Sequence, residues 1–126
     1  MGYPADLKYS KTHEWVKNNA SEVSVGITEY AQKELSDVVY VELPEVGREV
    51  SAGEAVCVVE SVKAAFDIYT PVAGTIVDVN STVEDDPALV NNDCYGKGWL
   101  FKVEVSDPKQ INAMMDAESY TKHVEG

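Results

Sequence analysis

Apolar residues in this chain fall into short runs that are rich in Val, Ile, Thr and aromatic side chains. Pro and Gly residues stand between the runs, at positions 44–47, 52–53, 71–74 and 95–98. Short runs bounded by turn residues are typical of β-strands. We predict strands at residues 22–27, 37–42, 55–60, 66–69, 74–79 and 99–105. Their spacing predicts a small, mostly β domain, either a sandwich or a barrel.

The stretch between the first two predicted strands shows the signals of a helix instead. Thr28 is a favourable N-cap residue, and an acidic residue follows it in the first turn. Ala31 and Leu35 stand four residues apart, so they lie on the same face of a helix. We therefore predict a short helix directly after Thr28.

The C-terminal part of the chain also predicts helices. Asp107 followed by Pro108 is a typical helix start, because Asp caps a helix and Pro suits its first position. One face of this helix is predicted to carry three apolar residues: Ile111, Met114 and Met115. A last helix is predicted from Asp116 through Tyr120. Together they form a helical extension over about 107–124, which should pack on the β domain.

Length and charge limit the class of protein. The chain has 126 residues and carries 22 acidic against 10 basic side chains, a formal net charge of −12. This length predicts one domain over residues 1–126 with its own core. No apolar run approaches the ~20 residues of a membrane span, and an acidic surface repels nucleic acid and anionic lipid. We expect no nucleic-acid partner and no membrane association.

The first residues carry no targeting signal that we recognise. They lack the apolar core of a signal peptide and the acid-poor, Arg-rich composition of a transit peptide. We therefore expect a cytoplasmic bacterial protein, or a mitochondrial matrix protein if the chain is a processed eukaryotic one.

Few side chains are suited to catalysis or to metal binding. The candidate nucleophiles are Cys57 and Cys94, and the candidate bases are His13 and His123. Cys57 lies in an apolar run and His123 near the chain end, so an independent active site is disfavoured. The cysteines lack CxxC spacing, and we expect both to be buried free thiols. Because the His and Cys residues are scattered, we predict no metal site.

The most informative stretch is about 55–74, where two strand-like runs flank a short connection. We predict a hairpin with Lys63 near its tip. A lysine in that place extends a flexible stem and an amine into water, where a modifying enzyme can reach it. Most lysines between strands, however, only solvate a turn. Spacing alone leaves both interpretations of Lys63 open.

The sequence around Lys63 favours modification. The segment VVESVKAAFDIYTPVAG at 58–74 resembles the lipoyl-attachment hairpin of lipoyl-bearing carrier domains, and its ESVKA form resembles the H protein of the glycine cleavage system. Further motifs match that family in order: KTHEWV at 11–16, VGITEYAQKELSDVVYVELPEVG at 25–47, AGEA at 52–55, YGKGWL at 95–100 and SDP at 106–108. The resemblance covers the chain from about residue 8 to residue 120.

This resemblance implies a flattened β-barrel or barrel–sandwich hybrid of the lipoyl-domain type, with short helices. It implies that the cofactor is lipoate, joined to Lys63 through an amide, and that Glu60, Ser61, Val62 and Ala64 are recognition flanks. The arm formed in this way reaches roughly 14 Å from its Cα atom at ordinary bond lengths. The implied protein is a monomeric carrier and not an enzyme.

The resemblance also implies partners. In the family, glycine decarboxylase loads the arm with the aminomethyl group of glycine. An aminomethyltransferase passes the one-carbon unit to tetrahydrofolate, and dihydrolipoamide dehydrogenase reoxidises the arm with NAD. A lipoylating enzyme attaches the cofactor. Strong negative charge is compatible with fast, small-area encounters with successive partners.

Two acids, Glu14 and Asp67, are implied by the resemblance to lie near a cleft that shields the loaded arm. The amine at the end of that arm is cationic, and a desolvated cation needs a carboxylate partner. The alternative is that Glu14 is a solvated strand-edge acid and Asp67 a solvated acid of the hairpin stem. Trp15, next to Glu14, is expected to lie in the core.

The sequence departs from the family pattern at two positions. Phe66 stands where a small polar residue is usual, and Cys94 where proline is usual. Phe66 has three open roles: packing, covering the arm, or altering recognition by lipoylating enzymes. Two other functions stay open, an H-like protein that relays lipoyl groups to other complexes and an unmodified interaction domain. A biotin carrier is disfavoured, because Val62 and Ala64 replace the Met residues that usually flank a biotinylated lysine.

Overall fold

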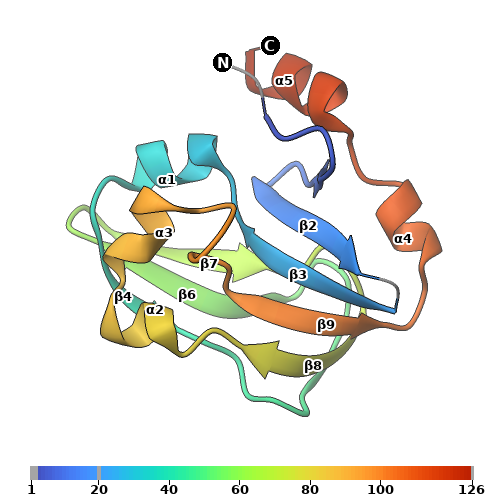
Figure 1. Cartoon of the computed structure of the whole chain (residues 1–126), viewed down its shortest axis with the longest axis horizontal. Coiled ribbons are helices and arrows are strands. Elements are labelled where there is room, and N and C mark those ends of the chain that lie inside the picture. The colour runs from blue at the N-terminus through green and yellow to red at the C-terminus, as the bar shows by residue number, and fades with distance from the viewer. Residues whose placement is uncertain (1–2, 20, 126) are drawn as a thin grey trace.

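Two antiparallel sheets make up most of the protein (Figure 1). The structure is a computed structural model that describes residues 3–19 and 21–125. In order across the sheet, the larger one contains β1 (Lys8–Tyr9), β2 (Glu14–Asn19), β3 (Glu22–Ile27), β9 (Phe101–Val105), β8 (Gly74–Val79) and β5 (Glu49–Val50). The smaller sheet contains β4 (Val38–Glu42), β6 (Ala55–Ser61) and β7 (Ala65–Tyr69).

The main core lies between these two sheets. Val25 and Val103 of the larger sheet and Val41 and Val59 of the smaller sheet have no exposed surface and belong to one cluster. Burial of such side chains stabilises the fold by roughly 25 cal/mol per Å² of apolar surface. The predicted mostly β class is confirmed, and the ordering of the strands within the described residues shows that the sheets are not closed into a barrel.

All six predicted strands are present, within two residues of the expected bounds. Three further strands, β1, β2 and β5, were not predicted. Two of them, β1 and β5, contain only two residues each, which is too short to give a periodic pattern. Two short helices were also missed, α2 (Thr82–Asp85) and α3 (Ala88–Asn92), which lie beside β4 and cover that edge of the smaller sheet.

The helix predicted after Thr28 is confirmed as α1 (Glu29–Leu35). The Thr28 hydroxyl accepts a hydrogen bond from the Ala31 backbone N–H at 3.2 Å, as an N-cap residue should. Leu35 is buried against the core and ends the helix, and the C-cap residue Ser36 has a φ of 65°, which is unusual for a residue other than glycine. This helix lies at the same end of the molecule as the β6–β7 hairpin (Figure 1).

The predicted C-terminal extension is present as two helices, α4 (Lys109–Asn112) and α5 (Ala117–Glu125). The expectation that Met114 and Met115 continue the face of Ile111 on one helix is wrong, because α4 ends before them. The backbone of Met115 instead pairs with that of Tyr9, through hydrogen bonds of 2.8 and 3.0 Å. This pairing brings the C-terminal segment onto β1 (Figure 1).

The last helix packs on the N-terminal segment and not on the two-sheet core. Tyr120 of α5 has no exposed surface, and its ring stacks on Tyr9 with a centroid separation of 4.7 Å. These rings belong to a second hydrophobic cluster that also contains Leu7 and Trp15. Trp15 is 1% exposed, which confirms its predicted core position. In the part of the chain that the structure describes, no helix is long and apolar enough to span a membrane.

Candidate functional site at the β6–β7 hairpin

The tip of the β6–β7 hairpin carries Lys63, as predicted. Strands β6 and β7 are paired antiparallel up to Glu60 and Ala65, and Lys63 lies in the four-residue connection between these positions. Val62, Lys63 and Ala64 are all exposed. The lysine is therefore presented to solvent by a pair of strands whose other ends are anchored in the core.

Ser61 orders the turn that carries this lysine. Its hydroxyl oxygen accepts hydrogen bonds from the backbone N–H groups of Lys63 at 3.1 Å and Ala64 at 3.3 Å, and the hydroxyl itself donates to the Ala64 carbonyl oxygen at 3.2 Å. The Ser61 backbone N–H donates to the same carbonyl at 2.8 Å. A serine at the start of a turn favours this arrangement, because its side chain replaces a backbone acceptor.

Two further contacts hold the tip against neighbouring elements. The Val62 backbone N–H donates to the carbonyl oxygen of Asp37, just before β4, at 3.0 Å. The Lys63 ammonium donates to the backbone carbonyl oxygen of Glu34 in α1, also at 3.0 Å. A cation near the last turn of a helix is favourable because unpaired carbonyls point there. Lys63 forms no salt bridge with any described residue, so its amine is tied only by an exposed hydrogen bond.

A cleft of about 170 Å³ lies beside the hairpin, between α1 and β7. Its apolar lining includes Ile27, Leu35, Phe66 and Ile68. Glu34 and Asp67 supply carboxylates to the lining, and both residues are exposed. The cleft therefore combines apolar walls with acids near its opening, and the structure places Asp67 in it. Phe66, which is 38% exposed, forms part of one wall.

Glu14 occupies a different place. Its side chain is 1% exposed, so the alternative of a solvated strand-edge acid is wrong for this residue. One carboxylate oxygen accepts hydrogen bonds from the hydroxyls of Ser10, at 2.6 Å, and Thr12, and the other accepts the Tyr69 backbone N–H at 3.2 Å. Burial raises the pKa of Glu14, while these hydrogen bonds act in the opposite direction.

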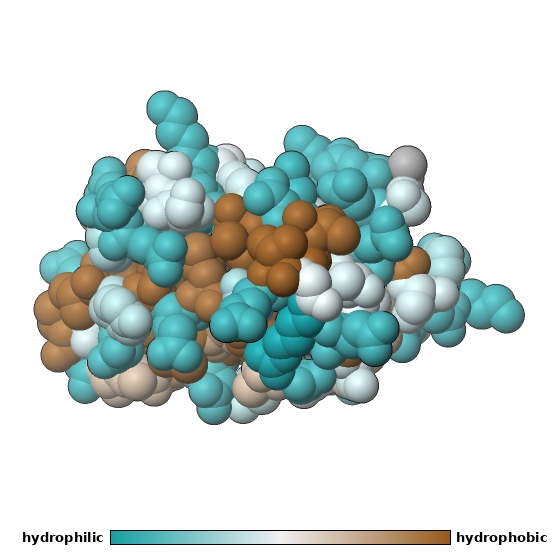
Figure 2. Space-filling view, turned by 90° about the horizontal axis from the view of Figure 1, so that it is seen from below, coloured by the Kyte–Doolittle hydropathy of each residue, from teal (hydrophilic) through white to brown (hydrophobic). Residues whose placement is uncertain are grey.

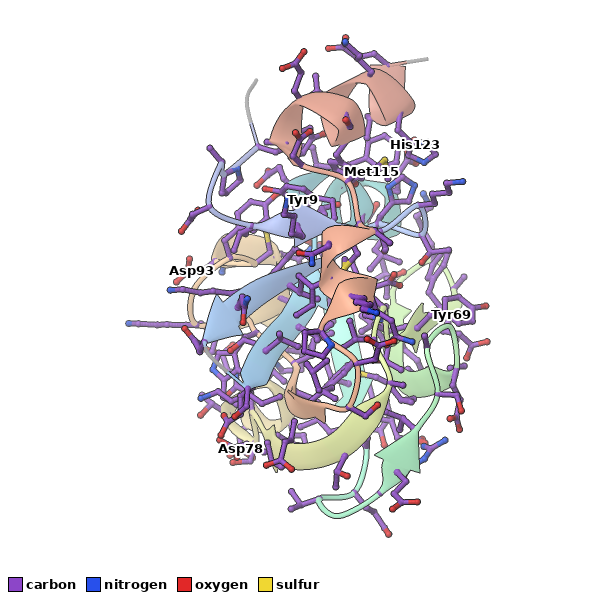
Figure 3. The ribbon with its side chains drawn as sticks, turned by 90° about the vertical axis from the view of Figure 1, so that its right-hand side faces the viewer. Tyr9, Tyr69, Asp78, Asp93, Met115 and His123 are labelled. Atoms are coloured by element: carbon purple, nitrogen blue, oxygen red, sulfur yellow. The ribbon has the colours of Figure 1, made fainter. Side chains whose placement is uncertain are left out.

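Glu14 lines a larger neighbouring cavity of about 400 Å³. This cavity is bordered by Tyr9, Tyr69 and Met115, which Figure 3 labels on the side of the molecule that faces the viewer. Thr12 lines both this cavity and the cleft beside Lys63. Glu14 and Asp67 thus lie on two adjoining cavities that share Thr12, and the shielding of an arm by these acids stays a prediction.

A hydrogen-bond network that we did not predict from the sequence lies on the side of the cleft formed by the β1–β2 connection. His13 has a φ of 74°, and its Nδ1 atom lies 2.7 Å from the hydroxyl of Tyr120, which is 2.8 Å from the hydroxyl of Thr28. Burial lowers the pKa of His13, and the nearby His123 acts in the same direction. The network links α5 to the N-cap of α1. The sequence indicates that Thr28 caps a helix, but it contains no signal that Thr28 also pairs with Tyr120.

The cysteines are poor nucleophiles in this fold. Both are buried free thiols, as predicted. Burial raises the pKa of the Cys94 thiol to about 12 and raises that of Cys57 still further, so both thiols are protonated at neutral pH. The Cys94 carbonyl accepts the indole N–H of Trp15 at 3.0 Å. Over residues 3–19 and 21–125, no group of three His, Cys, Asp or Glu side chains is arranged to hold a metal ion.

Comparison with known proteins gives a consistent result. The family model described as "Glycine cleavage H-protein" matches residues 7–126. The glycine cleavage system H protein of a Thermus thermophilus strain is 56% identical over 125 residues, which cover 99% of this chain and 98% of that protein. The corresponding protein of Shewanella denitrificans is 55% identical over 118 residues, covering 93% of this chain and 92% of that protein.

A solved structure agrees with these sequence matches. The crystal structure of a glycine cleavage system H protein from Mycobacterium marinum superposes with a TM-score of 0.90 at 39% identity, covering 98% of this chain and all of that one. Both the sequence and the fold therefore match over nearly the whole length. The chain belongs to the glycine cleavage H-protein family.

Proposed function

We propose that this protein is the lipoyl-bearing carrier of a glycine cleavage system, with lipoate in amide linkage on Lys63. The main support for this proposal is that Lys63 is exposed at the tip of a hydrogen-bonded hairpin, next to an apolar cleft, in a member of the H-protein family. The protein is a carrier component and supplies no active site of its own. It passes the aminomethyl group of glycine from the decarboxylase to the aminomethyltransferase.

The residues at the tip fit an acylated lysine. Among the described residues, the Lys63 amine binds one exposed carbonyl oxygen, so freeing it for reaction costs about one ordinary hydrogen bond, roughly 1 kcal/mol. Acylation removes the positive charge, and an amide nitrogen keeps one N–H that is able to donate. The turn itself is held by Ser61 and by the Asp37 carbonyl. Its order therefore does not depend on the charge of Lys63.

A bound lipoyl group supplies a disulfide that accepts a one-carbon amine fragment and is restored by oxidation. The chain's own residues provide shelter and orientation. Ile27, Leu35 and Ile68 offer apolar contact to an aliphatic arm, and Asp67 and Glu34 offer carboxylates to a cationic group at its end. Through its hydrogen bonds, Glu14 holds Thr12, which lines both the cleft and the larger cavity, and Tyr69, which lines the larger cavity. We assign Glu14 an indirect role, because its oxygens already accept three hydrogen bonds.

The same features support several successive partners. An arm of roughly 14 Å is long enough to enter the active sites of separate enzymes while the carrier stays outside. The net charge of −12 favours electrostatically steered encounters, and it disfavours self-association of a monomer. The proposed partners are glycine decarboxylase, aminomethyltransferase, dihydrolipoamide dehydrogenase and a lipoylating enzyme.

Reconstitution with the three enzymes of the cycle tests this function. Lipoylated protein should support NADH formation that depends on glycine and tetrahydrofolate, and the Lys63→Arg variant should support none, because Arg keeps the charge but lacks the primary amine. Lipoylated protein that is reoxidised normally but gives no glycine-dependent NADH would favour the lipoyl-relay alternative. A chain that accepts no lipoyl group would favour an unmodified interaction domain.

A further inference from the structure

Strand β4 contains a bulge that turns two consecutive side chains outward. Its register against β6 shifts between Val38 and Tyr40. In a regular strand, neighbouring side chains point to opposite faces, so one of each pair would be buried. Here Val39 is 55% exposed and Tyr40 is 48% exposed. β-Bulges commonly change the direction in which side chains point. The bulge in β4 therefore exposes two large side chains where a regular strand would expose one.

The exposed pair lies beside the tip of the hairpin. Tyr40 is paired with Glu60, and Val38 with Ser61. The carbonyl of Asp37 accepts the backbone N–H of Val62, which is itself 66% exposed. Val39, Tyr40 and Val62 therefore form one apolar area, which we call the β4 patch. Figure 2 shows apolar surface at the left-hand end of its view, the end at which Figure 1 draws this hairpin.

Three carboxylates lie next to the β4 patch along β4 and β6. Asp37, Glu42 and Glu60 are all exposed, and each is next to or paired with a residue of the patch or its strand. An apolar centre with an acidic rim fits a partner surface with an apolar centre and a basic rim. A second copy of this chain does not meet that description, because it would bring another net charge of −12 to the contact.

We propose that the β4 patch is the docking surface of the lipoylating enzyme. The reason is reach, and the inference rests on the function proposed above. The neutral Lys63 amine must attack the carbonyl carbon of an activated lipoyl group. The C–N bond forms, the activating group leaves with the bonding electrons, and the amine loses a proton to solvent. The amine lies only about 6 Å from its Cα atom at ordinary bond lengths, so the enzyme must cover the surface around the tip.

The enzymes that act on the finished arm are under no such constraint. They receive a reactive end that stands roughly 14 Å from the same Cα atom, and they reach it without covering β4. The β4 patch should therefore matter when the lysine is modified and matter much less once the arm is in place. This difference distinguishes the lipoylating enzyme from the other partners.

Threonine substitutions test the proposal with little risk to the fold. The double variant Val39→Thr, Tyr40→Thr keeps side chains that suit a strand, and it replaces two of the three apolar side chains of the β4 patch. The matched control is Val46→Thr. Val46 is 59% exposed, like the residues of the β4 patch. It is attached to the other sheet, because the backbone N–H of the next residue, Gly47, donates a hydrogen bond to β8. Unfolding midpoints of all three proteins should agree, since exposed substitutions usually change stability by less than about 0.5 kcal/mol.

Steady-state lipoylation of the unmodified full chain, by a lipoate ligase with ATP and lipoate, gives the first measurement. Loss of two contact residues should raise KM for the double variant about tenfold, with kcat little changed. The Val46→Thr control should match the parent. Binding of the ligase to Lys63→Arg protein, which cannot be acylated, should weaken by a similar factor when the double substitution is added.

The fully lipoylated variants give the second measurement. Reoxidation of their reduced arms by dihydrolipoamide dehydrogenase should proceed at the parental rate. If lipoylation of the double variant keeps the parental KM, or if lipoylation and reoxidation slow equally, the assignment of this surface to the lipoylating enzyme is wrong. If the parent chain accepts no lipoyl group, the proposed function itself is wrong. If the parent is lipoylated and the double variant is lipoylated equally well, only the proposed docking surface is wrong.

Discussion

Ser61 has a structural task at the site, beyond being a residue that flanks the lysine. Replacing Ser61 with Ala removes the acceptor for the Lys63 and Ala64 N–H groups. We expect a loss of about 1 kcal/mol in the local stability of the turn, seen as roughly fivefold faster hydrogen exchange of those two amides. Lipoylation should slow as well, because the lysine then samples more conformations.

A conservative variant separates this positioning role from recognition of the side chain. Ser61→Thr keeps the hydroxyl and should restore both exchange protection and lipoylation. Ser51→Ala is the control, since no described residue hydrogen-bonds to the Ser51 hydroxyl at the β5–β6 turn. Unchanged exchange of the two amides in Ser61→Ala would show that the turn is ordered by other contacts.

Glu14 predicts a pH dependence of stability. Burial raises its pKa in the folded state above the ordinary value of 4.5, so the folded protein binds more protons than the unfolded chain just above pH 4.5. Stability due to this group therefore falls as the pH rises from 4.5 through the folded-state pKa. The Glu14→Gln variant cannot titrate at this position and should lack that part of the slope.

Urea unfolding of both proteins between about pH 4 and pH 8 measures this effect by linkage. The difference in unfolding free energy between the variant and the parent should grow with pH across that window. A constant offset is also expected, because a Gln amide is unable to accept from both Ser10 and Thr12 and from Tyr69 in the same way. A pH-independent difference would show that Glu14 is not buried as a titrating group.

At the scale of elements, the cleft between α1 and β7 predicts a shielding effect. Asp67→Asn removes a carboxylate from the cleft lining without changing its shape. We expect protein carrying the glycine-derived one-carbon group to release formaldehyde about two to five times faster, the size expected for a partly exposed charge pair. Lipoylation should not change.

The matched control for this experiment is Asp78→Asn, an exposed acid on β8 in the larger sheet (Figure 3). A Phe66→Ala variant, which removes part of the apolar wall, should also release formaldehyde faster. Equal release by Asp67→Asn, Asp78→Asn and the parent would mean that Asp67 does not guard the arm.

Some elements of the fold could be predicted from the sequence and others could not. Strands such as β3 and β8 were predicted with their observed bounds, because apolar and β-branched residues dominate them and turns limit them. The C-terminal segment was predicted less well. Its apolar spacing suggested one longer helix, but pairing of the Met115 backbone with Tyr9, more than a hundred residues away in sequence, ends the helical segment early. Local pattern contains no information on such a partner.

Part of the candidate site was likewise predictable from the sequence, and part was not. The place of Lys63 at a hairpin tip follows from two flanking strands and a short connection. The carbonyl oxygens of Glu34 and Asp37 that hold the tip were not predictable, because any residue type supplies a carbonyl. The burial of Glu14 was likewise hidden, since a carboxylate in a polar sequence context is usually solvated. Its burial depends on hydrogen-bond donors from β7 and from the β1–β2 connection meeting in space.

At the scale of the whole molecule, the exposed lysine and the C-terminal helix lie in different parts of the protein. The two-sheet core anchors β6 and β7, and the C-terminal helix closes over the N-terminal segment at another end of the protein (Figure 1). The hairpin tip with Lys63 is exposed at the end of these two strands. The acidic charge is a property of the whole surface, and it acts on how fast partners approach rather than on which fold forms.

Lys63 alone should carry the lipoyl group, and mass analysis of the modified chain shows whether it does. The full-length chain is incubated with a lipoylating enzyme, lipoate and ATP, and its intact mass is measured before the modified residue is located by peptide mapping. We expect one lipoyl increment, located on Lys63, and no increment on the Lys63→Arg variant. An increment on any other lysine, or an equal increment on Lys63→Arg, would contradict this expectation.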